Sequence, residues 1–269
     1  MNVTVTNYVE LIHAIHNANL HPHEPFVIEL AESNEEYVLR DYVDGGFYGK
    51  NGLPVVTSNI TINGNGRTIS RADDAVPFRL FGVNTTSWHR NHVVRLVLND
   101  LTLRNGKSWV DGGGAMLNNG EVMLNNCVFE DNVGTHGGAI YNGDAHPLAA
   151  KNCVFRNNTG LLEGGAIYNA NLAQLGLEEC AFENNRVIKG QSVDIYVFST
   201  VKPLRFMGDG KATATVSMNG TVLSAEDVQT LHRFAQTNPP AVLTPPHKRA
   251  IPLIEDGYED DYDIDDERS

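Results

Sequence analysis

The hexapeptide "GGAIYN" occurs twice in this chain, at residues 137–142 and 164–169. Each copy is followed by a Cys-x-Phe segment and then an asparagine, "CVFRN" at 153–157 and "CAFEN" at 180–184. Aligning the chain on its cysteines, which are 26 and 27 residues apart, reveals three columns of equivalent residues. The first column holds Leu101, Cys127, Cys153 and Cys180, the second Leu103, Phe129, Phe155 and Phe182, and the third Asn132, Asn158 and Asn185.

A repeat of this length, made of short strands with alternating apolar residues and Gly or Asn between them, is typical of a β-solenoid. Each strand then pairs with its equivalent one coil away, at about 4.8 Å, and identical residues form ladders. We expect the Cys and Phe columns to fill the interior. The third-column asparagines are expected to turn a corner in the left-handed conformation. About seven coils fit between residues 28 and 210 at this repeat length.

Helical signals flank the repeats. Asn7 and Glu10 resemble a capping box that begins a helix running through Asn17 and covering the first coil. The segment 224–238, "SAEDVQTLHRFAQTN", predicts a second helix with Ser224 as its N-cap. The predicted organisation is therefore an N-terminal capping helix segment (1–27), a parallel β-helix (28–210), a C-terminal strand and helix (211–238), and a Pro-rich linker with an acidic tail (239–269).

Charge is concentrated in the last fifteen residues, "EDGYEDDYDIDDERS", which carry −8 of the formal net charge of −13. This tail is expected to be disordered and to be able to dock a basic partner. The chain has no basic stripe of the kind that nucleic-acid binding needs, and no apolar run long enough for a membrane span. Three cysteines spaced by the repeat indicate structural thiols rather than a metal site or disulfides.

Together, "GGAIYN" and the "NCVFxxN" pattern resemble the repeats of chlamydial polymorphic outer-membrane proteins, and of related proteins among the pectin-lyase-like right-handed parallel β-helices. The likeness covers about residues 5–210. It implies an all-β fold: a right-handed parallel β-helix with short capping helices. It also implies a secreted or cell-surface location, although no secretory signal is visible in this chain. This group includes adhesins, polysaccharide lyases and hydrolases, so the resemblance does not choose among functions.

One candidate catalytic strip lies beside the glycine pairs. His136 and Glu163 immediately precede equivalent glycines and should lie one coil apart, whereas Asp111 is offset by one residue unless an extra glycine bulges out. Two carboxylates beside an imidazole would suit metal binding or acid–base chemistry. The alternative is that all three are ordinary corner residues.

A second candidate is the charged face around Arg156, with Glu130, Asp131 and Glu183 on it. In pectate-lyase-like enzymes an arginine and calcium-binding carboxylates share one exposed face, so calcium is the ion that this resemblance implies. Alternating charge on neighbouring coils is equally what a solvated solenoid requires. The sequence itself predicts no cofactor.

Aromatic and amide side chains form the third candidate, a ligand-binding group of Trp109, Tyr141, Asn142, Asp144, Tyr168 and Asn169. Rings pack on sugar faces and amides bond hydroxyls, which favours a glycan platform if the tyrosines face outward. If Ala139 and Tyr141 instead face the interior, the tyrosines are core residues. The sequence leaves both assignments open.

Three functions compete on these grounds. The first is a non-catalytic surface or secreted module that binds a glycan or a protein partner. The second is a structural subunit that docks through its acidic tail, and the third is a polysaccharide lyase or hydrolase. The lack of a recognisable catalytic motif favours the binding module.

Overall fold

The structure is a computed structural model that divides into two units, Met1–Thr237 and Asn238–Ser269. It describes residues 1–32, 36–45, 49–84, 94–110, 112–143, 145–191, 193–198, 204–207, 214–224 and 226–228. The predicted linker and acidic tail (239–269) and most of the predicted C-terminal helix lie outside the described residues. Every helix and strand of the described residues belongs to the first unit.

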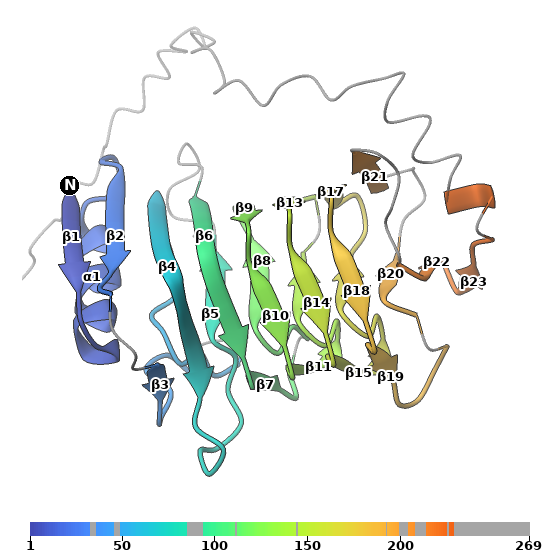
Figure 1. Cartoon of the computed structure of the whole chain (residues 1–269), viewed down its shortest axis with the longest axis horizontal. Helices are drawn as coiled ribbons and strands as arrows, with labels where there is room; N and C mark the ends of the chain where they lie inside the picture. Colours follow the sequence, from blue (N-terminus) through green and yellow to red (C-terminus); the bar gives the residue numbers. More distant parts are fainter. Residues whose placement is uncertain are drawn as a thin grey trace, which may run out of the picture. The chain divides into compact units, whose positions relative to one another are not determined.

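Three sheets make up this unit (Figure 1). The twelve-stranded sheet contains β1 (Asn2–Val5), β2 (Phe26–Leu30), β3 (Tyr37–Leu39), β4 (Ile60–Arg71), β6 (Arg95–Arg104), β9 (Glu121–Asn125), β10 (Val128–Glu130), β13 (Pro147–Lys151), β14 (Val154–Arg156), β17 (Gln174–Glu178), β18 (Ala181–Glu183) and β21 (Leu204–Met207). The four-stranded sheet contains β7 (Lys107–Ser108), β11 (Val133–His136), β15 (Thr159–Glu163) and β19 (Arg186–Val187). The seven-stranded sheet contains β5 (Phe81–Asn84), β8 (Met116–Asn119), β12 (Ile140–Asn142), β16 (Ile167–Asn169), β20 (Ile195–Val197), β22 (Val216–Met218) and β23 (Thr221–Val222).

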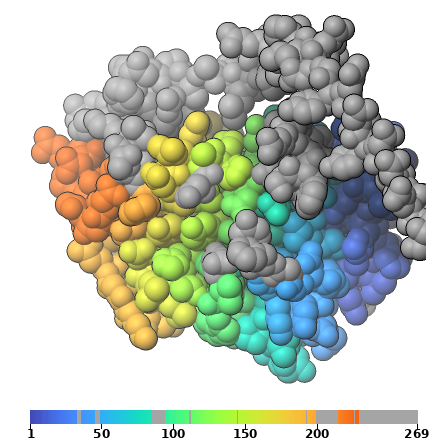
Figure 2. Space-filling model, turned by 180° about the vertical axis from the view of Figure 1, so that it is seen from behind, coloured from blue at the N-terminus to red at the C-terminus, as the bar shows by residue number. Residues whose placement is uncertain are grey.

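Strands pair with their equivalents one repeat away, and they do so in parallel. Phe129 of β10, for example, lies between Leu103 of β6 and Phe155 of β14. We call each passage of the chain through the sheets a coil. Successive coils lie side by side in chain order, as the adjoining colour bands of Figure 2 show. This arrangement is compatible with the predicted all-β solenoid.

The number of coils agrees with the repeat length. From β2 to β21 the described chain passes seven times along the main path of the twelve-stranded sheet. The last strands, β22 and β23, instead form an antiparallel pair.

Interior ladders explain why the repeat is visible in the sequence. Cys127, Cys153 and Cys180 are buried one above another, as predicted. The rings of Phe129, Phe155 and Phe182 stack with centroids 4.9 Å apart and planes within 10°. Stacking of this kind contributes about 0.5–1.5 kcal/mol per aromatic pair beyond the burial of apolar area.

The left-handed corners lie one residue earlier than the sequence suggested. Asp131, Asn157 and Asn184 have φ of 55°, 55° and 53°, whereas the third-column asparagines that follow them are not left-handed. The prediction for the third column was therefore wrong. Asn and Asp tolerate positive φ because their short polar side chains bond the local backbone, so the first residue of each pair, Asp or Asn, makes the turn. A second left-handed column precedes the cysteines, at Asp100, Asn126, Asn152 and Glu179.

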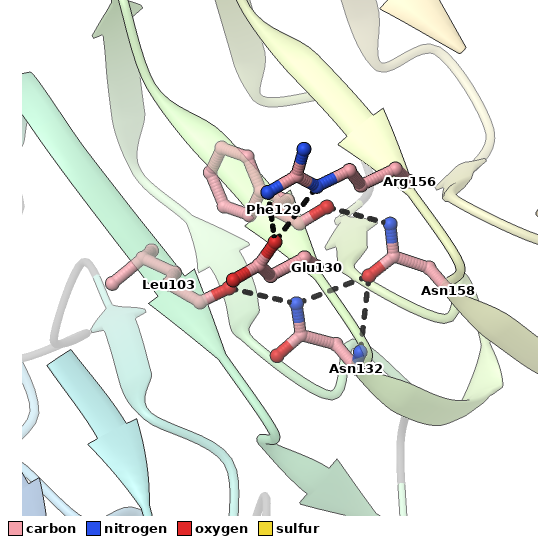
Figure 3. Close-up of polar contacts among 6 residues, drawn as sticks. All are labelled: Leu103, Phe129, Glu130, Asn132, Arg156 and Asn158. Atoms are coloured by element: carbon pink, nitrogen blue, oxygen red, sulfur yellow. Dashed lines mark hydrogen bonds and ion pairs between the residues drawn. The ribbon is translucent and has the colours of Figure 1, made fainter. Parts of the chain in front are cut away.

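The third column forms a hydrogen-bonded ladder, which we call the asparagine ladder: Asn132 and Asn158, which are fully buried, and Asn185, which is partly buried. Figure 3 shows Asn132 and Asn158. Asn132 Nδ2 donates to Asn158 Oδ1 at 3.0 Å, and Asn158 Nδ2 donates to Asn185 Oδ1 at the same distance. Each amide also donates to the carbonyl of the preceding coil's second column, as Asn158 does to Phe129 at 2.9 Å. The polar groups that the corners bury are thus satisfied from coil to coil.

The N-terminal cap is largely as predicted. Helix α1 (Tyr8–Leu20) begins after Asn7, whose Oδ1 accepts from the backbone N–H groups of Val9 and Glu10 at 3.0 Å. The Glu10 carboxylate accepts from the backbone N–H and hydroxyl of Thr6 rather than from the backbone N–H of Asn7, and the helix runs three residues beyond Asn17. Leu11, Ala14, Ile15 and Ala18 of this helix belong to the core.

At the other end, Ser224 caps a helical turn at residues 226–228, and its hydroxyl accepts from the Asp227 N–H at 3.1 Å. The Asp227 carboxylate in turn accepts from the Ser224 N–H at 3.1 Å, as in a capping box. None of the helices in the described residues has the length and apolarity that crossing a lipid bilayer requires.

Candidate functional site

Two of the three residues of the strip beside the glycine pairs, His136 and Glu163, lie one coil apart, as their spacing predicted. His136 of β11 pairs with Glu163 of β15 across one coil, and His136 Nε2 lies 3.9 Å from Glu163 Oε2. Each side chain is about one third exposed, at 32% and 36%. The glycines that follow them, Gly137 and Gly164, have φ of 67° and 64°, which a residue with a Cβ atom disfavours.

Asp111 itself lies outside the described residues, but its neighbours fix the register. The N–H of Gly113 donates to the carbonyl of His136, as the N–H of Gly137 donates to the carbonyl of Glu163. Gly113 is therefore the equivalent of Gly137, and Gly112 occupies the position of His136. The extra glycine therefore stays in the register and does not bulge out.

Tyr141, Tyr168 and Tyr196, on β12, β16 and β20, form what we call the tyrosine ladder. The strands pair these residues in register, and the adjacent isoleucines, Ile140 and Ile167, are fully buried. Alternation along a strand therefore turns the tyrosines outward. This settles the assignment that the sequence left open.

Most ring-face area in this ladder is used within the molecule. Ring centroids are 5.0 Å apart for Tyr141 and Tyr168 and 5.4 Å apart for Tyr168 and Tyr196, with planes within 16° and 7°. A Cβ atom added to Gly112 would lie 2.7 Å from the ring of Tyr141, so the backbone there packs against that ring. Ring edges and hydroxyl groups are consequently what the tyrosine ladder presents outward.

Asn142 and Asn169 do not share that surface. Both are fully buried, and they form a second amide ladder in which Asn118 donates to Asn142 and Asn142 to Asn169, each at 2.7 Å. Asn169 Nδ2 donates to the carbonyl of Ala173 at 2.9 Å. These amides hold the turns after the strands together and are not available to a surface ligand. Asp144 lies outside the described residues.

Glu163 connects the strip to the tyrosine ladder. Burial raises the pKa of Tyr196, and the negative charge of Glu163 and its hydrogen bond with the phenol raise this pKa further. The imidazole of His136 meets Tyr168 edge-on, with centroids 5.2 Å apart. His136, Glu163 and the tyrosine ladder therefore form one continuous polar surface.

A row of exposed apolar side chains crosses the coils of the four-stranded sheet, beside this surface. Ser108, Gly134, Gly160 and Val187 are partners in the register of its strands. The residues that follow them are Trp109, Thr135, Leu161 and Ile188. Trp109 and Ile188 are 52% and 59% exposed, and the next residue of β15, Leu162, is 39% exposed. We call Trp109, Leu161, Leu162 and Ile188 the apolar row.

A buried arginine that the sequence did not reveal holds one end of this row. Arg79 is fully buried, and its Nη2 donates to the carbonyls of Val110 and Gly112 at 2.8 and 3.0 Å and to the hydroxyl of Ser108 at 3.0 Å. These bonds fix the segment that presents Trp109. In the sequence Arg79 is one charged residue among apolar ones, with no feature that distinguishes it from an exposed strand arginine.

Arg156 is part of an ion ladder on the twelve-stranded sheet, whereas the apolar row belongs to the coils of the four-stranded sheet. Residues of alternating charge, Arg104, Glu130, Arg156 and Glu183, pair across successive coils, and the Arg156 guanidinium donates to Glu130 through Nε at 2.7 Å (Figure 3). Calcium prefers several converging oxygen ligands. A guanidinium between the carboxylates does not meet that requirement, so these residues do not fit a calcium ion.

The cysteines form a third kind of ladder, and their thiols are free and buried. Each thiol lies within hydrogen-bond reach of a carbonyl in the preceding coil, as Cys127 Sγ does to Leu98 at 3.4 Å. The hydrogen bond with Cys127, together with burial, raises the pKa of Cys153 to about 12. Among the described residues, no three His, Cys, Asp or Glu side chains gather as metal ligands would.

Comparison of the chain with protein-family models, with curated proteins and with solved structures gives no match. Function must therefore be inferred from the surface formed by the apolar row, His136, Glu163 and the tyrosine ladder.

Proposed function

We propose that this protein is a non-catalytic binding module, built as a right-handed parallel β-helix, that holds a glycan or a protein partner against one corner of its coils. The right-handed winding of the coils is supported by the strong preference of crossover connections between parallel strands for that hand. Secretion or display at a cell surface is the setting that the resemblance of the repeats supports.

The observation that carries this proposal is that exposed apolar side chains, a His–Glu pair and a tyrosine ladder lie next to one another at one corner of the coils. The apolar row exposes Trp109, Leu162 and Ile188 where an isolated solenoid would gain solubility from polar residues. His136 and Glu163 adjoin the row, and the edges of the tyrosine ladder follow. An exposed apolar patch with a polar border is typical of an interaction surface.

Binding fits this corner better than hydrolysis. Glycoside hydrolysis uses two carboxylates that flank the reacting bond, and among the described residues of the strip Glu163 is the one carboxylate. That carboxylate is already engaged by His136 and Tyr196. In the part of the corner that the structure describes, these contacts favour a role in anchoring a ligand.

Thermal unfolding of the full-length protein with neutral and acidic oligosaccharides, each with and without calcium or zinc, tests the glycan part of the proposal. A ligand at one hundred times its Kd stabilises the fold by about 2.7 kcal/mol. The shift should disappear in Trp109→Ser and persist in the matched control Met123→Ser. Met123 is also exposed, at 38%, but lies on β9 of another sheet. A shift retained in Trp109→Ser would place the ligand elsewhere, and turnover of an oligosaccharide would replace binding by catalysis.

A further inference from the structure

The spacing of the apolar row points to a particular class of partner. Trp109 and Ile188 directly follow β7 and β19, and Leu161 and Leu162 lie on β15. Thr135 of β11 lies between Trp109 and the leucines, so the row crosses four neighbouring coils. Strands in a sheet are about 4.8 Å apart. The row therefore runs about 14 Å along the direction in which the coils stack. Three of the four coils carry an apolar member of the row, with two leucines on β15, and the fourth carries Thr135.

An α-helix matches this period. One helical turn rises 5.4 Å, so residues at i, i+4, i+7 and i+11 of one face span about 16 Å. An extended strand repeats a given face every two residues, at about 6.6 Å, and its four equivalent residues span about 20 Å. The 5.4 Å helical turn is close to the coil spacing of about 4.8 Å, so the side chains of a helix along the row stay near successive coils. The two-residue repeat of a strand, about 6.6 Å, exceeds that spacing and loses register after two coils.

Side-chain chemistry favours a protein over a glycan at this row. A pyranose ring packs on an open aromatic face. Trp109 is exposed and can offer one, but the faces of Tyr141, Tyr168 and Tyr196 lie largely against one another. Leu162 and Ile188 offer no hydrogen bonds to sugar hydroxyls. Aliphatic and tryptophan side chains are instead what the apolar face of an amphipathic helix buries.

The positive charges at one end of the row indicate which way a bound helix would point. Arg186 and Lys189 are exposed on either side of Ile188, at the β19 end of the row. Cations stabilise the C-terminal end of a helix, where the macrodipole is negative. The polar surface of His136 and Glu163 flanks the middle of the row and suits the polar border of such a helix.

From these relationships we infer that the apolar row binds an amphipathic helix of a partner protein, lying along the coils with its C-terminus toward β19. This inference rests on the proposed function, because it names the partner class for the same corner.

Selection from a displayed peptide library tests it. One sublibrary places Leu, Ile, Met or Phe at i, i+4, i+7 and i+11 of peptides about five turns long, and the other places the same residues at alternate positions. The bait is the full-length protein. Recovered peptides are then synthesised with a fluorescent label and titrated by anisotropy against the wild type, Trp109→Ser, Ile188→Ser and the control Met123→Ser.

We expect enrichment of the helix-patterned sublibrary. Recovered peptides should bind Trp109→Ser and Ile188→Ser at least tenfold more weakly than the wild type, and Met123→Ser equally well. Unchanged thermal unfolding of the variants shows that they are folded.

Enrichment of the alternate pattern, no enrichment, or binding that ignores both serine substitutions would overturn the helix inference. The proposed function survives that result if oligosaccharide binding depends on Trp109. If neither peptides nor oligosaccharides respond to substitutions at the corner, the proposed function fails as well.

Discussion

Asn158 lies one coil beyond Asn132, and its Oδ1 accepts from both the side-chain Nδ2 and the backbone N–H of Asn132, at 3.0 and 3.1 Å. Both residues are fully buried. One atom thus satisfies two donors of the neighbouring coil. This relationship repeats between Asn158 and Asn185, where Asn185 Oδ1 accepts from the same two groups of Asn158.

We expect Asn158→Ala to destabilise the fold by about 3 kcal/mol, because two buried donors of Asn132 lose their acceptor. Urea unfolding followed by circular dichroism measures the loss. The matched control is Asn157→Gly, at the adjacent exposed position where φ is 55°; glycine adopts that conformation freely, so this variant should stay near the wild type. If both substitutions lowered the free energy of unfolding equally, the hydrogen bonds of the asparagine ladder would not explain the loss in Asn158→Ala.

The asparagine ladder ends on a carboxylate. Asn185 Nδ2 donates to Asp194 Oδ1 at 2.9 Å, and Asp194 Oδ2 accepts from the N–H and hydroxyl of Thr215, each at 2.8 Å. Asp194 therefore joins the last coils to the segment that enters β22.

Asp194→Asn should destabilise the protein by about 2 kcal/mol, because an amide cannot accept from Asn185 and Thr215 at both of its heavy atoms. Urea unfolding is the measurement, and Asp227→Asn, in the exposed C-terminal capping box, serves as a comparison for the same chemical change. An Asp194→Asn protein as stable as the wild type would mean that the amide finds other partners.

Glu179 is an anomaly in its column. The equivalent residues Asn126 and Asn152 have φ of 54° and 53° and suit the left-handed conformation, whereas Glu179 adopts φ of 51° without a short polar side chain. Asn152 Nδ2 also donates to Asn126 Oδ1 at 3.2 Å, so this column has a ladder that Glu179 does not continue.

Glu179→Asn should stabilise the fold by about 0.5–1 kcal/mol, because it relieves the backbone cost and offers an amide to Asn152. For a domain of this size that corresponds to about 2–4 °C per kcal/mol in Tm. Glu24→Asn makes the same change at an exposed residue with ordinary φ and controls for the lost charge. A lower Tm for Glu179→Asn than for Glu24→Asn would contradict this explanation.

The sequence alone revealed most of the fold because the ladders repeat identical residues. Cysteine spacing fixed the register of the inner columns, and the GGAIYN copies correctly placed His136 next to Glu163. The corners at 157–158 and 184–185 were ambiguous because each has two adjacent asparagines, and asparagine suits both a left-handed turn and an amide ladder. The backbone angles show that the first residue of each pair adopts the left-handed conformation, and the hydrogen bonds show that the second residue forms the asparagine ladder.

Orientation and distant contacts were harder to predict. Ile and Tyr alternate in β12 and β16, and both residue types occur in cores, so the pattern alone did not show which one faces inward. Asn142 and Asn169 were assigned to the surface for the same reason, although they are buried. Arg79 acts on residues about thirty positions later in the chain, and local periodicity carries no sign of that contact.

The three cysteine thiols should resist modification in the native protein. All three are buried, which keeps the reagent from reaching them. Hydrogen bonds along the cysteine ladder and burial raise the pKa of Cys153 and of Cys180, so their reactive thiolates are scarce at neutral pH. The hydrogen bond with Cys153 lowers the pKa of Cys127, so burial is what protects that thiol. A chromogenic disulfide reagent should label no thiol in buffer and all three in denaturing urea. Rapid labelling of one thiol in buffer would show that the cysteine ladder opens locally.

The raised pKa of Tyr196 predicts a loss of stability at high pH. Because the folded-state pKa lies above the unfolded value of about 10, the phenol favours the folded state fully below that pH, and the advantage is lost as pH rises through the folded-state pKa. Urea unfolding at pH 8, 10 and 11 (rough values chosen around the tyrosine pKa) should therefore show the wild type losing more stability than Tyr196→Phe. Tyr37, whose pKa is also raised, is present in both proteins and cancels in the comparison. Parallel pH profiles for the two proteins would mean that neither burial nor the carboxylate of Glu163 acts on this phenol in solution.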